Sequence, residues 1–170
     1  MLVPAIIYKD ELEEMFAKEL YTKDYFYYYG YRYGACLPEI VANDNDVKYA
    51  IVNHKGLIGY KGLIGYFAYK ADEANDTVCN FGLYSFDKGN PIIGIDIYNE
   101  FKKLYDRHRR IEWRMIGGNP VKKHYDRLCE KFNGNCVVLH DVCKGLDGTY
   151  RDEYIYEIVK EWRKEWRYGV

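Results

Sequence analysis

Two stretches of the chain join a strand to a helix through the same Gly-Asn-Pro turn. In the second stretch apolar and charged residues alternate from Ile111 to Met115, which is typical of a half-buried strand. Asn119 is a good N-cap, and Pro120 fits the first helical position, where a missing N–H costs nothing. Free backbone N–H groups converge at the start of a helix, so this arrangement suits the binding of a negatively charged group.

The earlier stretch repeats the pattern. A strand is predicted over Thr77–Phe86, and Lys88 and Gly89 lead to Asn90 as the N-cap and Pro91 as the first helical residue. One face of this strand is predicted to carry Cys79, Phe81, Leu83 and Ser85. One stripe of the following helix carries Gly94, Ile97, Tyr98, Phe101, Leu104 and Tyr105. The alternative interpretation of this loop is a plain connection between a strand and a well-capped helix.

The helix of the second stretch carries its own apolar stripe. Val121, Tyr125, Leu128 and Phe132 recur at helical spacing, and the Asn133-Gly134 pair predicts a left-handed C-cap. Tyr125 therefore has one explanation as a core residue before any chemistry is considered. Asn119 likewise is explained by capping alone.

At these residues the chain resembles the GNAT acyltransferase superfamily, and the order of the predicted elements extends the resemblance over nearly the whole chain. The resemblance implies an N-acetyltransferase that moves an acetyl group from acetyl-CoA to a primary amine. It implies that the loop Asp87–Gly94 holds the coenzyme A diphosphate and that Tyr125 protonates the thiolate leaving group. A backbone N–H between Leu83 and Phe86 would polarise the carbonyl. The implied coenzyme-binding residues are Leu83, Tyr84, Ser85, Phe86, Lys88, Gly89, Asn90, Ile93, Gly94 and Asn119.

A run of tyrosines between residues 21 and 33 lies where the family places its acceptor site. The resemblance implies an acceptor pocket formed by Tyr25, Tyr28 and Tyr29, for a small-molecule or peptide amine. The alternative is that these rings pack in a half-buried helix and leave their hydroxyls in water. Asp24 is the expected cap of that helix.

No single residue stands out as the base that would deprotonate the amine. The candidates are Glu112, Asp76, His124 and His140, and a water molecule is an alternative. His124, His140, Asp141 and Cys143 lack the spacing of a standard metal site, so we expect no metal.

Composition narrows the class of protein. The 170 residues are 48% hydrophobic and 30% charged, which indicates one folded domain with a sizeable core. A net charge of -1 argues against broad nucleic-acid binding. We expect a cytoplasmic protein with reduced thiols, because the five cysteines are odd in number and form no CxxC pair. The acidic residues from Asp10 to Glu14 do not suit a signal peptide, and no apolar run is long enough for a membrane span.

The remaining elements complete the expected sheet. Strands are predicted at Leu2–Tyr8, Val47–Asn53, Phe67–Lys70, Cys136–Val142 and Glu153–Lys160, and Asp10 is predicted to cap the first helix with Glu13 in a variant capping box. Basic residues near the end of the helix after Pro91 are expected to form a solvated face, with contact to the coenzyme 3′-phosphate as the lesser alternative. They are Lys102, Lys103, Arg107, Arg109 and Arg110.

One feature has no counterpart in the resemblance. KGLIGY at 55–60 is followed at once by an identical copy at 61–66, in the predicted hairpin between the second and third strands. The insert has an even length, so it preserves which side chains face the core. We predict that the extra copy lengthens the tip of the hairpin; the competing outcome is an extruded loop.

These observations predict a single α+β domain over residues 1–170. Its sheet is mixed, mostly antiparallel and twisted, with six to seven strands and helices on both faces. The alternative function is a non-catalytic GNAT-like module that binds a partner through the tyrosine-rich face. Trp162 and Trp166 are expected to cover either the sheet edge or the partner of a homodimer.

Overall fold

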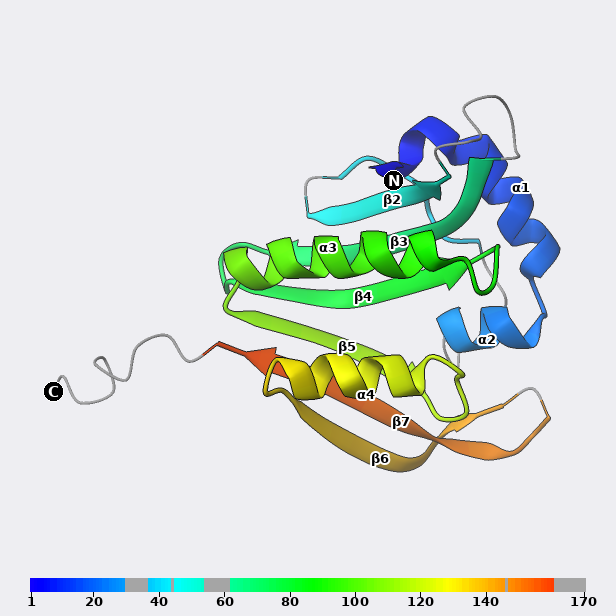
Figure 1. Ribbon diagram of the computed structural model, residues 1–170. Coiled ribbons are helices and arrows are strands. Elements are labelled where there is room, and N and C mark those ends of the chain that lie inside the picture. Colours follow the sequence, from blue (N-terminus) through cyan, green and yellow to red (C-terminus); the bar gives the residue numbers. More distant parts are fainter. Residues whose placement is uncertain (30–36, 44, 54–61, 146, 161–170) are drawn as a thin grey trace, which may run out of the picture.

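A single mixed sheet organises the molecule (Figure 1). The computed structural model describes residues 1–29, 37–43, 45–53, 62–145 and 147–160. Within these ranges seven strands follow the order β1-β2-β3-β4-β5-β7-β6, and β4–β5 is the one parallel neighbour pair. The predicted fold class is therefore confirmed. The elements are β1 Leu2–Pro4, a 3-10 helix Ala5–Tyr8, α1 Lys9–Glu19, α2 Lys23–Tyr29, β2 Asp46–Val52, β3 Leu63–Asp72, β4 Thr77–Ser85, α3 Pro91–Arg107, β5 Arg110–Ile116, α4 Lys122–Lys131, β6 Asn135–Lys144 and β7 Tyr150–Val159.

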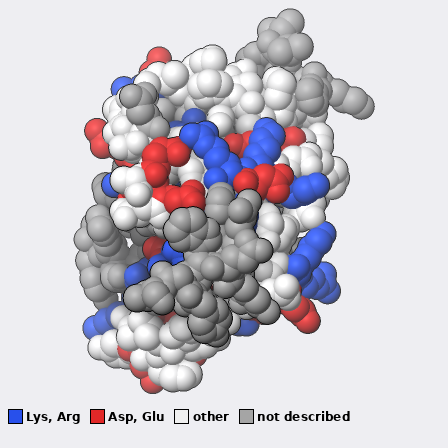
Figure 2. Space-filling model, turned by 90° about the vertical axis from the view of Figure 1, so that its left-hand side faces the viewer, with Lys and Arg blue, Asp and Glu red and all other residues white. Residues whose placement is uncertain are grey.

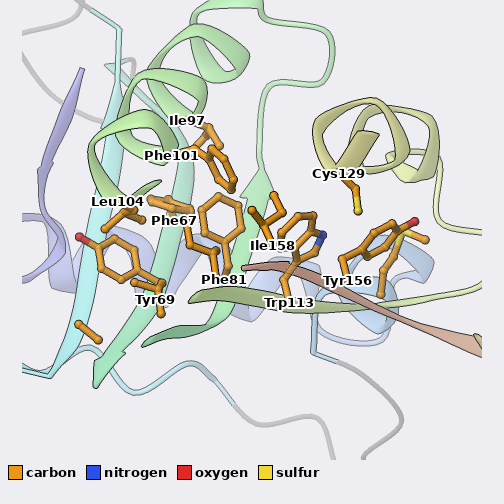
Figure 3. Packing of buried hydrophobic residues seen from close by; sticks show 14 of the residues in the cluster. Phe67, Tyr69, Phe81, Ile97, Phe101, Leu104, Trp113, Cys129, Tyr156 and Ile158 are labelled. Atoms are coloured by element: carbon orange, nitrogen blue, oxygen red, sulfur yellow. The ribbon is translucent and has the colours of Figure 1, made fainter. Parts of the chain in front are cut away.

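Two hydrophobic cores lie on opposite faces of this sheet. The larger packs α3 and α4 against one face, and Figure 3 shows Phe81, Trp113 and Tyr156 of the sheet beneath Phe101 of α3 and Cys129 of α4. The smaller packs α1 and α2 against the other face, with Phe16 at its centre. Helices on both faces follow from the alternation of apolar residues along the central strands.

The N-terminal elements differ from the expectation. The predicted strand Leu2–Tyr8 ends at Pro4, and the chain turns through the 3-10 helix straight into α1. Asp10 therefore lies inside α1, and no side chain caps that helix. The predicted cap of α2 is also wrong: Thr22 Oγ1, not Asp24, accepts the N–H of Tyr25 at 3.1 Å.

A β-bulge interrupts β4. Asn80 and Phe81 together stand opposite the single residue Tyr69 of β3, and Asn80 has φ +55°. The extra residue shifts the alternation, so Val78 and Phe81 both face the larger core. Cys79 consequently does not share a face with Phe81, Leu83 and Ser85, as the uninterrupted period-2 pattern had predicted.

The tandem repeat is placed in part. Leu63–Tyr66 of the second copy forms the start of β3 and pairs with β2. The first copy at 55–60 falls within residues 54–61, outside the described residues, so the lengthened hairpin tip stays a prediction. Trp162 and Trp166 also lie outside the described residues.

Charged side chains near the end of α3 form ion pairs rather than a continuous basic surface. Lys103 pairs with Glu100 at 2.9 Å, and Arg107 pairs with Glu73 at 2.6 Å. Figure 2 views the molecule from the side at which α3 ends and shows basic and acidic atoms interspersed. Among the described helices none is long and apolar enough to cross a membrane.

Candidate active site

The strands β4 and β5 pair only where they begin and then separate. Their register contains Thr77↔Arg110 and Val78↔Ile111. Figure 1 shows the two strands diverging toward the end where α2 lies. The bulge at Asn80 falls directly after this pairing, so β4 turns away from β5 at that point.

A cavity of about 870 Å³ opens between the separated strands, a size suited to a small-molecule ligand. Both faces of the sheet contribute to its wall. Phe81, Leu83, Trp113 and Met115 point toward α3 and α4, because all four belong to or pack against the larger core. Alternation along β5 then directs Glu112 and Arg114 to the α2 face. The cavity therefore connects the two faces of the sheet.

Tyr125 lines this cavity from α4. Its ring packs edge-on against Trp113, with the centroids 5.7 Å apart, and against Tyr156, with the centroids 6.0 Å apart. Its hydroxyl forms no hydrogen bond with any described residue. Burial raises the pKa of Tyr125 to about 12, so the phenol is protonated at neutral pH. The two readings of Tyr125 therefore coexist: the ring packs in the core, and the residue borders the cavity.

The start of α3 is well capped. Asn90 Oδ1 accepts the N–H of Ile92 at 3.0 Å, as predicted, and the carbonyl of Asn90 accepts the N–H of Ile93 at 3.3 Å. Pro91 has no N–H. The first N–H groups of the helix are therefore already used, and those of Lys88 and Gly89, which bond to no described residue, are left for an anion.

The implied coenzyme-binding residues divide by position. Leu83, Tyr84, Ser85, Lys88, Gly89 and Asn119 line the cavity. Ile93 packs into the larger core, Phe86 packs against the smaller core, and Gly94 is exposed with open space around it. Asn90 caps α3 and lies outside the lining. Sequence periodicity shows which face of a helix is buried. It does not show which residues of the preceding loop face the cavity, so part of the implied set lies outside the lining.

Two charged groups bear on this loop. The ammonium of Lys88 is paired with Asp24 of α2, and this contact raises the pKa of Lys88. Asp87 Oδ2 accepts a hydrogen bond from Asn90 Nδ2 at 2.8 Å. The positive charge of Lys88 is therefore shared with α2, and the loop itself carries a carboxylate.

Asn119 serves the turn before α4. Its Oδ1 accepts the N–H of Val121 at 3.1 Å, and its carbonyl accepts the N–H of Lys122 at 3.1 Å. The sequence predicted Pro120 as the first helical residue. In the structure the regular helix begins later, at Lys122. At the other end Asn133 has φ +52°, which confirms the predicted left-handed end of the helix.

The predicted acceptor tyrosines occupy different places. Tyr25 is 3% exposed and packs in the smaller core, outside the cavity lining. Tyr28 lines the cavity and stacks on Phe16, with the ring centroids 6.0 Å apart. The side chain of Tyr29 lies outside the described residues. Tyr27, which sequence reasoning did not single out, also lines the cavity.

The candidate bases also divide. Glu112 and the exposed His124 line the cavity. Asp76 and His140 lie outside the lining. Asp76 is in the turn between β3 and β4, and His140 is on β6, where it contacts Asp152 of β7. Arg114 of β5 and Glu153 of β7 line the cavity and were not predicted. A charged residue in an alternating strand suggests a solvent-facing position, and only the separation of β4 from β5 turns that face into a cavity wall.

Comparison with solved structures agrees with this fold. A probable GNAT-family acetyltransferase from Chromobacterium violaceum has a TM-score of 0.60 at 15% identity over 94% of this chain and 85% of its own. A GCN5-related N-acetyltransferase from Brucella melitensis has a TM-score of 0.60 at 16% identity, covering 93% and 74%. The ribosomal-protein-S18-alanine N-acetyltransferase of Escherichia coli has a TM-score of 0.53 at 13% identity, covering 75% and 77%.

No protein-family model matches the sequence, and no curated protein matches it. The likeness thus lies in the overall fold, at identities that show the fold alone. The chain has the α+β fold of the GNAT-family acetyltransferases.

Proposed function

We propose that this protein is an N-acetyltransferase that transfers an acetyl group from acetyl-CoA to a primary amine. The observation that carries the proposal is the cavity between β4 and β5, because it connects the two faces of the sheet. An acyl donor and an acceptor that enter from opposite faces would meet in this gap. Tyr125 borders the gap on the α4 side.

Two backbone N–H groups of β4 suit the acyl donor. Phe86 donates its N–H to Ile64 of β3, so alternation directs the N–H groups of Leu83 and Ser85 away from β3 and toward the gap. An N–H aimed at the oxygen of a reacting carbonyl typically contributes about 2.7–4 kcal/mol to catalysis. Ser85 Oγ is also buried without a hydrogen-bond partner among the described residues. These groups fit the amide-rich arm and thioester of coenzyme A.

The chemistry divides among few residues. Bound acetyl-CoA would supply the activated acyl group. The backbone N–H of Leu83 or Ser85 would stabilise negative charge on the carbonyl oxygen, and Tyr125 would donate its proton to the departing thiolate. The proton that the amine loses would pass to Glu112, to His124 or to a water molecule, and from there back to Tyr125. A positioned acid of this kind accelerates a reaction roughly 10²–10⁴-fold. The pKa of about 12 keeps the Tyr125 proton in place until it is needed.

A second candidate function is a binding module without catalysis. It is favoured by the start of α3, where Pro91 lacks an N–H and Asn90 occupies those of Ile92 and Ile93. It is also favoured by the pairing of Lys88 with Asp24, which lowers the positive charge available to a diphosphate. The two candidates differ in whether acetyl-CoA is consumed.

The deciding experiment incubates the full chain with acetyl-CoA and a panel of primary amines that includes amino acids, short peptides and simple alkylamines. Thiol release and the mass of each acetylated product are measured together. Amine-dependent thiol release with a matching product supports the enzyme. No consumption of acetyl-CoA with any amine in the panel would instead support the binding module.

A further inference from the structure

Two oppositely charged side chains, Arg114 and Glu153, lie close together on the α2 side of the cavity. Arg114 Nη1 lies 3.5 Å from Glu153 Oε1, longer than a charge-assisted hydrogen bond. Neither side chain forms a hydrogen bond with any described residue. Both line the cavity. By contrast Glu112 accepts a hydrogen bond from Arg110 at 2.8 Å, so its charge is already satisfied.

The two groups lie at different depths. The side chain of Glu153 is 8% exposed, whereas that of Arg114 is 59% exposed. Glu153 stands directly opposite Ile116 in the β5–β7 register, and directly opposite residues share a face. Both charges therefore belong to the α2 face of the sheet, with the carboxylate deep in the wall and the guanidinium toward the mouth.

A buried carboxylate without a hydrogen-bond donor is costly, so a ligand that supplies a donor would bind favourably. A simple cation would serve Glu153 but would place its charge beside the guanidinium of Arg114. A simple anion would meet the reverse problem at Glu153. A zwitterion with its positive end inward and its negative end outward satisfies both groups at once.

We propose that the acceptor is a free α-amino acid, whose ammonium binds Glu153 and whose carboxylate binds Arg114. This inference rests on the proposed acetyl transfer, because it names the class of amine that this reaction would acetylate. In an α-amino acid the two charged groups share one carbon, as the closely spaced Arg114 and Glu153 require. Tyr27, Tyr28 and Ile155 form the neighbouring wall, which suits an apolar or aromatic side chain on the amino acid.

The test is equilibrium binding to the full chain, measured by calorimetry with and without coenzyme A and without any turnover. Each of the twenty amino acids is first screened by thermal shift. The best binder is then compared with its carboxamide and with the amine that lacks the carboxylate. We expect the amino acid to bind at least about tenfold more tightly than either analogue, because only it pairs with Arg114.

Variants separate this site from general effects. Arg114→Gln should remove the tenfold preference by weakening the amino acid alone, and Glu153→Gln should weaken all three ligands. Arg107→Gln is the matched control, because Arg107 is also an exposed arginine paired with a glutamate, at Glu73, and it lies outside the cavity lining. Arg107→Gln should leave the affinity for all three ligands unchanged.

Two results would overturn the inference. One is that no amino acid binds, or that the carboxamide and the plain amine bind as tightly as the amino acid. The other is that Arg114→Gln weakens all three ligands equally. Either result can occur while simple amines are still acetylated, in which case the proposed function survives and only the acceptor class is wrong. If an amino acid binds at this site but no acetyl transfer occurs, the amino-acid site stands and the proposed acetyl transfer is wrong.

Discussion

At the scale of single residues, the ring and the hydroxyl of Tyr125 have different surroundings, so packing and chemistry can be tested separately. Its ring contacts Trp113 and Tyr156, while its hydroxyl has no hydrogen-bond partner among the described residues. Removing the hydroxyl alone therefore leaves the packing of the ring in place. If the hydroxyl has a role, that role lies in the cavity.

Tyr125→Phe should lower kcat for acetyl transfer about 10²–10⁴-fold and change the free energy of unfolding by less than about 1 kcal/mol. Steady-state kinetics and urea unfolding measure the two quantities. Tyr105→Phe is the control, since Tyr105 is also a tyrosine on an apolar stripe, where it packs against Phe132. Unchanged kcat in Tyr125→Phe would remove the phenol from the mechanism.

Sequence reasoning placed some residues of the site and missed others for a physical reason. Local patterns identified Asn90 as a cap and put Tyr125 on the inner stripe of its helix, since both depend on neighbours within one turn. Arg114 and Glu153 depend on the register between β5 and β7, which no local pattern contains. Tyr25 and Tyr28 share one helix, and only the packing of that helix on β4 decides which borders the cavity.

At the scale of secondary-structure elements, the start of α3 combines stability with a potential anion site. Asn90 accepts the N–H of Ile92, and its amide donates to Asp87. Two substitutions at this one position separate the two roles, because Ala removes the cap whereas Asp keeps it and adds negative charge.

Asn90→Ala should lower the free energy of unfolding by about 1 kcal/mol through loss of the cap. Asn90→Asp should cost less stability, because aspartate caps as well as asparagine. It should weaken acetyl-CoA binding more than Asn90→Ala does, because a second carboxylate would stand beside Asp87. Urea unfolding and calorimetry check the two halves, and equal coenzyme affinity in both variants would argue that no diphosphate binds here.

A second element-scale contact ties α1 to the sheet. Tyr84 of β4 is 4% exposed and donates its hydroxyl to Glu19 Oε2 at 2.6 Å. Tyr84→Phe should destabilise the fold by about 1.5–3 kcal/mol, the usual range for a hydrogen bond to a charged group. Tyr98→Phe is the control, because the Tyr98 hydroxyl accepts from Lys131 at an exposed site and should contribute little. Equal losses in the two variants would contradict this account.

Most elements were predictable because caps and periodicity mark them, as with Asn90 for α3 and Asn133 at the end of α4. The errors arose where tertiary structure overrides a local pattern. A bulge at Asn80 changed the face of Cys79, and a 3-10 helix before α1 displaced the expected cap at Asp10. A bulge is fixed by the neighbouring strand, so period-2 counting within β4 alone does not reveal it.

At the scale of the whole molecule, the two cores flank a sheet that is divided at one place. Strands β1 to β4 pair on one side, and β5, β7 and β6 pair on the other, joined by the short β4–β5 contact. The cavity follows from this topology, and the fold class was predictable from element order together with the family resemblance.

Buried tyrosines make the whole fold sensitive to alkaline pH. Burial raises the pKa of the hydroxyls of Tyr66, Tyr69, Tyr84, Tyr125 and Tyr156 above the ordinary value. The folded state then binds more protons than the unfolded state above pH ~10, so their contribution is complete below that pH and is lost as pH rises. Urea unfolding from pH 8 to 11 should show a falling free energy beginning near pH ~10. A constant value up to pH 11 would contradict the burial of these hydroxyls.

The most direct test of the central claim is thermal unfolding with and without excess acetyl-CoA. At about a hundredfold excess over the dissociation constant, binding should stabilise the fold by ~2.7 kcal/mol. For a chain of this length that corresponds to a rise in Tm of roughly 5–10 °C. A rise of that size would establish a coenzyme site and support the proposed enzyme. No shift at millimolar acetyl-CoA would mean that the gap between β4 and β5 holds no coenzyme, and it would contradict the proposed acetyl transfer.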